Sequence, residues 1–463
     1  MMRRGVFGRS AQAASIVTAV TLLIIVFLMR ASAEMASSGS VSPTATPGTT
    51  PSASPTPKPP LRPVVLMTGG TGMISAPTGQ SPAVLNTAEI YDPAVGKFFA
   101  ISRMKFHRDR HAAVLLRGGK VLIVGGVNTI LVPLVSFPGP AMPWILSSTE
   151  LFDSLSGDFE NGASMTTPRD EPTAALLKNG TVLVLGGGGD SAEIYDPANG
   201  KFARTGAMSE SRYGQTATLL RDGRVLITGG GSESAELYDP STGKFSSAGE
   251  MAHNRIYFTA TLLFDGRVLL TGGSRYARSA ALNTTEYYDQ VNAAFEPGPK
   301  MNETRAGQTA TLLNDGRVLI AGGHQDNSAE IYDPVTQSFI ATSPMNASRY
   351  GHSATLLPDG RVLIAGGWDL SYKPLASAEI FDPATGKFGK TGSMSEARAG
   401  QTATLVWMRW QPPRPTPSPT PAAHATQSMG ASPTSAALAA SPAATSRATP
   451  SASAATTPSP PRQ

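Results

Sequence analysis

Residues 318–349 read VLIAGGHQDNSAEIYDPVTQSFIATSPMNASR, and the pattern of this stretch recurs along the chain. An apolar run ends in Gly-Gly, and a second run carries a Glu three residues before an Asp. Phe, Met and Arg then follow 6, 12 and 16 residues after that Asp. The spacing of 19 residues from Glu to Arg occurs in seven units: Glu89/Arg108, Glu150/Arg169, Glu193/Arg212, Glu236/Arg255, Glu286/Arg305, Glu330/Arg349 and Glu379/Arg398. Such regular self-similarity predicts a repeat architecture.

Each unit has the turn chemistry of four short antiparallel strands. Pairs such as Asp359-Gly360 accept positive φ and favour tight hairpins, and Asp382-Pro-Ala-Thr-Gly386 suits a turn between the outer strands. The apolar runs before Gly-Gly suit strands that neighbouring units cover on both faces. Four strands per unit, seven units and no room for helices predict an all-β, seven-bladed β-propeller.

The repeat is offset at the two ends of the chain. The first unit, which begins near Val64, has no strand before its apolar run, whereas residues 401–410 form a spare strand after the last unit. We therefore predict that the C-terminal strand 401–410 closes the ring as the innermost strand of the first blade.

The repeat resembles that of Kelch propellers over residues 63–410. The hallmarks are Gly322-Gly323 and Tyr332-Asp333 with their equivalents, although this chain has Phe where the family usually has Trp. The resemblance implies a fold in which most members bind proteins and a minority are enzymes, such as galactose oxidases and sialic-acid mutarotases. The chain contains no cysteine, so the Cys–Tyr cofactor of copper radical oxidases cannot form. No cofactor, metal site or catalytic residue is expected.

Both ends differ in composition from the repeats. Residues 1–33 contain Arg3, Arg4 and Arg9, then an apolar run and Ala31-Ser-Ala33, which is typical of a signal peptide or an N-terminal membrane anchor. Residues 34–62 and 411–463 are rich in Pro, Ser, Thr and Ala and are predicted to be disordered. We expect an extracellular or cell-surface protein that meets the membrane only through its N-terminal segment.

The positive charge lies in the ends of the chain. The formal charge of the whole chain is +5, but residues 1–62 and 400–463 together carry +9, so the middle carries −4. A nucleic-acid partner is therefore not expected, because such proteins place basic residues on the folded domain.

The repeated arginines allow two interpretations. Arg108, Arg212 and Arg349 could line one mouth of the channel and meet an anionic group of a ligand. Alternatively, each Arg pairs with a repeated Glu of its own or a neighbouring blade.

Length varies at one place in each repeat. The first Gly of the Gly-Gly pair stands 20, 25, 7, 7, 14, 8 and 13 residues before the Glu of the same unit. The long loops, 71–87, 127–148, 274–284 and 368–377, should share one face with the arginines. Candidate binding residues on these loops and the neighbouring one are Trp144, Arg275, Tyr276, His324, Trp368, Asp369 and Tyr372. The apolar loop 127–148 either forms part of a binding rim or plugs the channel.

Two classes of function follow from these features. The first is an exported, non-catalytic module that binds a glycan or protein partner through the loop-rich face. The alternative is an exported carbohydrate-active enzyme. Carboxylates or histidines that converge at the channel mouth would favour the enzyme, and an open aromatic rim without them would favour binding.

Overall fold

The computed structural model describes residues 59–76, 79–128, 144–277, 279–323 and 325–412. The predicted export segment and disordered flanks lie outside this range, apart from the few residues that adjoin the propeller. In the described ranges, no helix has the length and apolar character needed to cross a bilayer.

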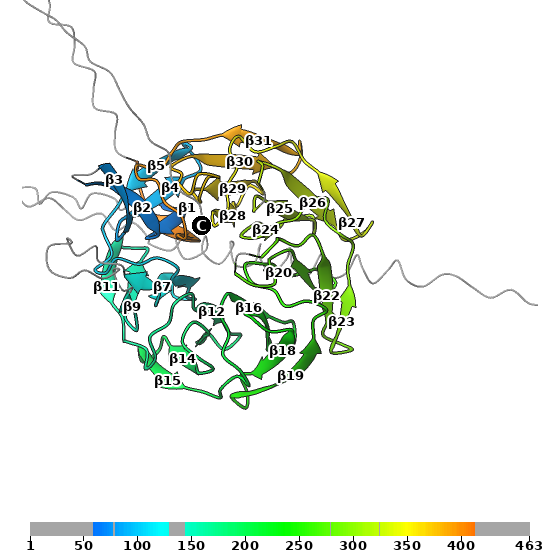
Figure 1. Cartoon of the computed structure of the whole chain (residues 1–463). Coiled ribbons are helices and arrows are strands. Elements are labelled where there is room, and N and C mark those ends of the chain that lie inside the picture. The colour runs from blue at the N-terminus through cyan, green and yellow to red at the C-terminus, as the bar shows by residue number, and fades with distance from the viewer. Residues whose placement is uncertain (1–58, 77–78, 129–143, 278, 324, 413–463) are drawn as a thin grey trace, which may run out of the picture. The chain divides into compact units, whose positions relative to one another are not determined.

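The described residues form seven four-stranded antiparallel sheets arranged around a central axis, as predicted (Figure 1). The blades, from the innermost to the outermost strand, are β32 (Thr402–Arg409), β1 (Leu61–Thr68), β4 (Ala88–Asp92) and β5 (Lys97–Ala100) in blade 1; β6 (Ala112–Leu115), β7 (Lys120–Val124), β10 (Thr149–Asp153) and β11 (Asp158–Asn161) in blade 2; β12 (Thr173–Leu176), β13 (Val182–Leu185), β14 (Ala192–Asp196) and β15 (Lys201–Arg204) in blade 3; β16 (Gln215–Leu219), β17 (Val225–Gly229), β18 (Ser234–Asp239) and β19 (Lys244–Glu250) in blade 4; β20 (Thr259–Leu262), β21 (Val268–Thr271), β22 (Thr285–Asp289) and β23 (Ala294–Pro297) in blade 5; β24 (Thr309–Leu312), β25 (Val318–Ala321), β26 (Ala329–Asp333) and β27 (Ser338–Ala341) in blade 6; and β28 (Ser353–Leu356), β29 (Val362–Ala365), β30 (Ala378–Asp382) and β31 (Lys387–Lys390) in blade 7.

The hydrophobic core lies between neighbouring blades. Val64 and Leu66 of blade 1, for example, are fully buried in one cluster with Val121 and Ile123 of blade 2. The apolar runs before Gly-Gly are buried on both faces because each blade is covered by two others. The propeller is therefore stabilised by contacts between repeats.

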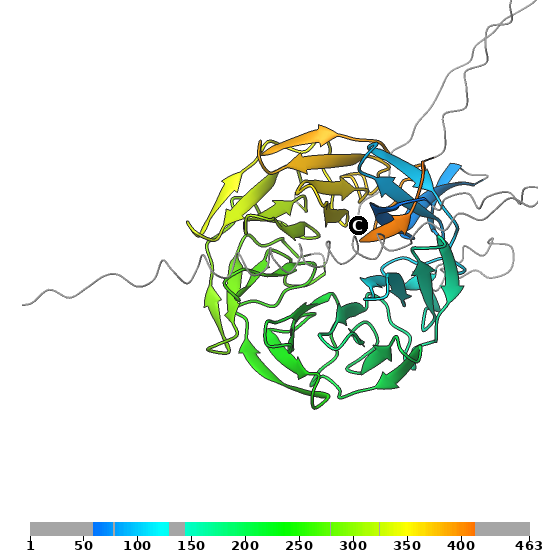
Figure 2. The same ribbon diagram turned by 180° about the vertical axis from the view of Figure 1, so that it is seen from behind.

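The C-terminal strand closes the ring, which confirms the prediction (Figure 2). Strand β32 pairs antiparallel with β1 along its whole length, from Leu61 opposite Arg409 to Thr68 opposite Thr402. The first strand begins at Leu61, two residues before the predicted boundary at 63. Pro63 is tolerated in it because β4 pairs only from Val65 onward, so no ladder bond is lost on that edge.

Each repeated Arg is buried and paired with a repeated Glu. Arg305 is typical: its Nε lies 2.8 Å from Glu330 Oε1, and its Nη1 donates to the carbonyl of Gly322 at 2.9 Å. The other oxygen of Glu330 accepts from the backbone N–H of Asn302 at 2.9 Å. We call this arrangement the Arg–Glu clasp. It joins the chain that enters a blade to the second and third strands of that blade.

The clasp corrects one interpretation of the sequence. The seven clasps are Arg108–Glu150, Arg169–Glu193, Arg212–Glu236, Arg255–Glu286, Arg305–Glu330, Arg349–Glu379 and Arg398–Glu89. Arg108, Arg212 and Arg349 are at most 1% exposed, so their charges are compensated inside the protein and do not face a ligand. The alternative interpretation, in which each Arg pairs with a repeated Glu, therefore holds for all seven arginines.

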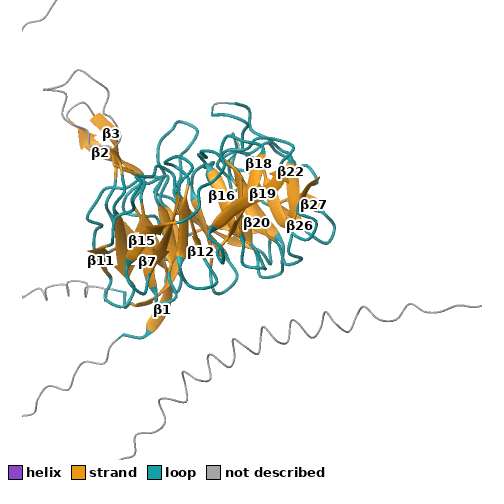
Figure 3. Cartoon of the chain, turned by 90° about the horizontal axis from the view of Figure 1, so that it is seen from below, coloured by secondary structure: helices purple, strands orange, loops and turns teal. Residues whose placement is uncertain are grey.

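The variable loops and the turns that contain the arginines share one face, as expected. Isolated bridges join the two sets of segments: Asp109 pairs with Val127, Ile256 with Ser274 and Tyr350 with Trp368. On this face a ribbon of β2 (Thr71–Ala76) and β3 (Gly79–Val84) projects from blade 1 (Figure 3). A short second ribbon joins β8 (Val127–Asn128) and β9 (Trp144–Ile145) in blade 2.

Candidate functional site

In the turn after each clasp arginine, one position with left-handed backbone is glycine in some blades and a larger residue in others. The second residue after the Arg is glycine in four blades, at Gly214, Gly307, Gly351 and Gly400, all with positive φ. In the other three blades it is Arg110, Glu171 or Tyr257, with φ of 55°, 54° and 54°. Left-handed backbone costs a non-glycine residue about 1–2 kcal/mol. Strain of this kind concentrates at functional sites, so these three residues are candidates for a role in function.

The same turns form a ring of backbone hydrogen bonds around the channel mouth. Gly307 N donates to Tyr257 O at 2.8 Å, Gly351 N to Gly307 O at 2.9 Å, Gly400 N to Gly351 O at 3.1 Å and Arg110 N to Gly400 O at 3.3 Å. The ring therefore runs unbroken from Tyr257 through three glycines to Arg110. The ring links the entries of blades 5, 6, 7, 1 and 2.

The ring is open between Arg110 and Tyr257. Among the described residues, no backbone hydrogen bond continues it from Arg110 to Glu171, from Glu171 to Gly214 or from Gly214 to Tyr257. These residues precede β6, β12, β16 and β20, which are inner strands near the axis (Figure 1). We call this interruption of the backbone ring the gap.

Side chains from three blade entries meet in the gap. Arg110 Nη2 lies 3.0 Å from Asp170 Oδ2, and Arg110 Nη1 lies 3.7 Å from Glu171 Oε1. Arg110 Nη1 also donates to Tyr213 Oη at 2.8 Å. Tyr213 and Tyr257 remain 38% and 40% exposed, so both present ring surface to solvent. The gap thus combines charge, hydrogen-bonding groups and aromatic surface.

Burial raises the pKa of three carboxyl groups at the gap, those of Glu171, Asp109 and Asp170. Desolvation raises the pKa of Glu171 to about 7, although the nearby Arg110 guanidinium opposes the shift. Desolvation also raises the pKa of Asp109 to about 6, opposed by the hydroxyl of Thr71, which donates to Asp109 Oδ2 at 2.7 Å. Both values fall near neutral pH, where a carboxyl group can exchange protons with a ligand.

Two carboxylate oxygens at the gap have no hydrogen-bond partner within the described part of the chain. They are Asp109 Oδ1 and Asp170 Oδ1, and both are shielded from solvent. Buried polar atoms in native proteins are nearly always satisfied. Neither oxygen is reached by solvent, and Asp109 Oδ1 lies where a side chain at Gly400 would stand.

The residues proposed from the sequence occupy other parts of the same face. Trp144 and Tyr276 are 67% and 66% exposed, and they lie on the separate loops of blades 2 and 5. Arg275 is exposed, and its Nη2 lies 3.2 Å from His253 Nδ1. His324 lies outside the described residues, as do positions 129–143 of the apolar loop.

The blade 7 loop brings together two of the proposed aromatic residues. Trp368 is half-buried and pairs through its backbone with Tyr350, whose ring meets that of Tyr372 edge-on at 6.2 Å. Tyr372 is 78% exposed. Asp369 Oδ1 accepts from the backbone N–H groups of Ser371 and Lys373, so this carboxylate shapes the loop.

Sequence reasoning missed the residues of the gap. Asp109, Arg110, Asp170 and Glu171 lie in turns of constant length, whereas the search followed variation in length. A comparison of the seven units at the second position after the Arg reveals Arg, Glu and Tyr against four glycines. Because only glycine adopts that backbone without strain, the presence of Arg, Glu and Tyr at this position in the sequence could have indicated the site.

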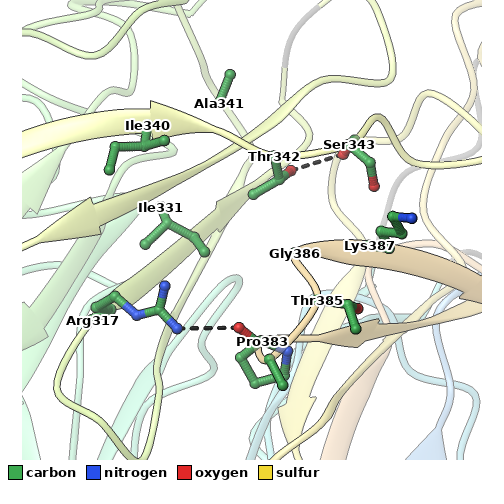
Figure 4. Close-up of a pocket in the computed structure, with 11 residues that line it drawn as sticks. Arg317, Ile331, Ile340, Ala341, Thr342, Ser343, Pro383, Thr385, Gly386 and Lys387 are labelled. Atoms are coloured by element: carbon green, nitrogen blue, oxygen red, sulfur yellow. Dashed lines mark hydrogen bonds between the residues drawn. The ribbon is translucent and has the colours of Figure 1, made fainter.

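Grooves also occur on the outer rim. One of about 410 Å³ lies between blades 6 and 7, where Arg317 Nη2 donates to the carbonyl of Pro383 at 3.1 Å (Figure 4). A similar groove of about 380 Å³ lies between blades 7 and 1, lined by Tyr91 and Arg361 among others. Because equivalent positions line both grooves, they are seams of the repeat rather than a specialised site.

Comparison with known proteins supports the fold. No family model matches the chain, and no curated protein matches its sequence. A solved structure described as a novel fungal alcohol oxidase of the AA5 family, in complex with copper, is similar to this chain with a TM-score of 0.52 and 18% identity. The match covers 63% of this chain and 66% of that protein, slightly less than two thirds of its length. The comparison therefore supports the β-propeller fold that this chain shares with that oxidase.

The residues of this chain do not fit the copper of that oxidase. The chain has no cysteine, and in the described ranges no three His, Cys, Asp or Glu residues are grouped so that they could hold a metal ion. His111 and His352 are buried at inner-strand starts, where their Nε2 atoms bond to threonine hydroxyls. No step of a reaction is therefore assigned to copper.

Proposed function

We propose that this chain is an exported carbohydrate-binding protein and that the gap is its ligand site. The observation that carries the proposal is the replacement of glycine by Arg110, Glu171 and Tyr257 at strained positions where the backbone ring ends or is interrupted. A ring of seven equal turns would be more stable with glycine throughout. The three side chains therefore have a use other than closure.

The chemistry of the gap suits a sugar better than a protein surface. Tyr213 and Tyr257 expose flat aromatic area on which a sugar ring can stack. The Arg110 guanidinium and the Tyr213 hydroxyl place polar groups beside these rings. The exposed Tyr372 and half-buried Trp368 extend the aromatic surface on the same face, as in ligand sites with a few placed polar groups.

A titration of the full-length chain against an array of neutral, amine-bearing and acidic hexasaccharides tests the proposal. We expect Tyr257→Ala to weaken the best ligand about 30-fold, which corresponds to about 2 kcal/mol. Phe264→Ala is the matched control, because Phe264 is 58% exposed and follows the opposite end of the same strand, β20. If no glycan binds and a pull-down captures a protein equally well with both variants, the proposal is wrong.

Export rests on the N-terminal sequence, with its basic residues, apolar run and Ala31-Ser-Ala33. External protease should remove the propeller from intact cells. Protection until the cells are lysed would contradict export without bearing on the glycan site.

The carboxyl groups of the gap support a second candidate, an acid–base enzyme that acts on carbohydrate. Glu171 and Asp109 have pKa values raised to about 7 and about 6, which suits general acid–base catalysis. This reading predicts that the array ligand is cleaved and that Glu171→Gln abolishes cleavage while it retains binding. Mass spectrometry of the oligosaccharide after prolonged incubation distinguishes the two candidates, because a binding protein leaves it intact.

A further inference from the structure

A buried histidine contacts both strands that close the ring. His111 lies just before β6 of blade 2 and is only 5% exposed. Its Nε2 lies 3.0 Å from the hydroxyl oxygens of both Thr68 and Thr402, and these two oxygens are 2.7 Å apart. Thr68 ends β1, and Thr402 begins the closing strand β32. We call these three residues the closure latch.

The latch has an acceptor for only one nitrogen of the imidazole. Nδ1 of His111 is shielded from solvent and has no hydrogen-bond partner within the described part of the chain. In the neutral ring Nδ1 can remain an unprotonated lone pair while Nε2–H donates to a threonine hydroxyl. A protonated ring has an N–H at both nitrogens, so one donor would be buried without a partner, together with a positive charge.

Burial and a neighbouring guanidinium both disfavour the charged form of His111. Arg108 precedes His111 in the same turn, where it is paired with Glu150 in the clasp of blade 2. Desolvation, with a further contribution from Arg108, lowers the pKa of His111 from 6.5 to about 3. An opening that exposes the ring to water restores the ordinary pKa, so the open state binds a proton that the closed state lacks. Opening therefore becomes more favourable as the pH falls below 6.5.

The other charged groups at this seam do not compensate a charge on His111. From blade 1, Arg398 adds a second guanidinium, which donates to the carbonyl of Gly69 beside the imidazole. From the turn before β6, Asp109 accepts from the hydroxyl of Thr71 rather than from Nδ1. The chain after β7 contributes only glycine backbone there.

The repeat itself contains a residue for this position that cannot be protonated. The equivalent position is glutamine in three blades, at Gln215, Gln308 and Gln401. The Gln308 amide donates to the carbonyl of Thr271 at 2.8 Å, which joins blade 6 to blade 5. A glutamine makes such a contact between blades at any pH, whereas a histidine makes it only while neutral.

The seam at which the ring closes is also the one that can separate. At the seam between blades 6 and 7, His352 contacts a single threonine, Thr309 of β24, and a hairpin joins β24 to β25. No hairpin joins β32 to β1, because the two strands come from opposite ends of the repeat region. Loss of the latch therefore frees a strand that only pairing and packing hold in place.

We propose that His111 is an acid-sensitive latch, whose protonation releases β32 from blade 1 and opens the propeller at the seam between blades 1 and 2. This inference goes beyond the proposed function and does not depend on whether a glycan binds. It describes a conformational device in which a local change of charge biases an opening of the fold.

Hydrogen exchange of the full-length chain, followed by mass spectrometry, tests the inference. Protection factors of β32 are compared with those of β20, an inner strand preceded by Phe258 at the position equivalent to His111. Between about pH 7.5 and about pH 5, the protection of β32 should fall at least about tenfold more than that of β20.

Two matched variants assign the effect to the latch. In His111→Gln, which introduces the residue of three other blades, the pH-dependent falls of β32 and β20 should agree within about threefold. His352→Gln removes the other buried histidine of this kind and should leave the selective loss at β32 unchanged.

The parent chain alone can decide against the inference, even if His111→Gln does not fold. Equal falls of protection in β32 and β20 would overturn it, because acid would then unfold the propeller as a whole. A selective loss at β32 that persists in His111→Gln, or that disappears in His352→Gln, would overturn the assignment to His111.

Discussion

Removal of one clasp charge should destabilise the whole propeller. In the clasp of blade 6 the side chains of Arg305 and Glu330 are each only 1% exposed. Glu330 Oε1 accepts from Arg305 at 2.8 Å, and Oε2 accepts from the backbone and side-chain N–H groups of Asn302 at 2.9 and 3.0 Å. Glu330→Gln keeps the shape but has one acceptor oxygen, so either Arg305 or Asn302 loses its partner.

The magnitude follows from the buried charge. Breaking a buried ion pair by removal of one partner costs about 3–5 kcal/mol, because the other charge stays buried and uncompensated. For about 350 cooperatively folded residues, the unfolding entropy converts 4 kcal/mol into a fall in melting temperature of about 5 °C. Circular dichroism melts and urea titrations of the full-length chain measure both quantities.

Two further variants define the comparison. Asp315→Asn breaks the exposed Arg317–Asp315 pair, whose side chains are 33% and 48% exposed, and should cost less than about 1 kcal/mol. In the double variant Arg305→Met with Glu330→Gln the buried charge is gone and the amide oxygen can serve Asn302, but the carbonyls of Gly322 and Ser328 lose the donor that Arg305 supplies, so this protein should remain less stable than the parent. If Glu330→Gln melts within about 1 °C of the parent, as Asp315→Asn should, the clasp does not stabilise the propeller.

Three other predictions concern the closing strand and the gap. Deletion of 401–463 should unfold the propeller, whereas deletion of 413–463 should not, and equal melting temperatures for the two truncations would refute closure by β32. Glu171→Gly should keep the free energy of unfolding within about 1 kcal/mol of the parent, because relief of the strain at positive φ offsets the added entropy of the unfolded chain. The same variant should abolish binding of the best array ligand, and retained binding would exclude Glu171 from the site. Because the pKa of Glu171 rises from 4.5 to about 7 on folding, the folded state holds a proton that the unfolded chain releases, and stability should fall by roughly 2–3 kcal/mol as pH rises from about 4.5 to 7. Urea midpoints at pH 5 and pH 8 should show a smaller fall for Glu171→Gln than for the parent, and identical falls would contradict the raised pKa.

The sequence led to two expectations about the face that carries the variable loops, and they had different outcomes. Divergence in loop length correctly indicated which face carries the loops, because the spacing of every other segment is constrained by ring closure. The expectation that arginines line the channel mouth and bind an anionic group was wrong, because Arg108, Arg212 and Arg349 are buried inside clasps. A residue that recurs in every unit contributes to the unit, and Arg with Glu recurs seven times.

The local sequence of each repeat was enough to determine the propeller. Turn pairs such as Asp359-Gly360, the apolar runs and the offset between the first and last units are short-range properties, and together they specify strands, blade number and closure by 401–410. The gap depends on tertiary structure. Arg110, Glu171, Tyr213 and Tyr257 are separated by 61, 42 and 44 residues along the chain. Only closure of the propeller brings these turns to one mouth, where burial raises the pKa of Glu171 and where the ring of backbone hydrogen bonds is interrupted.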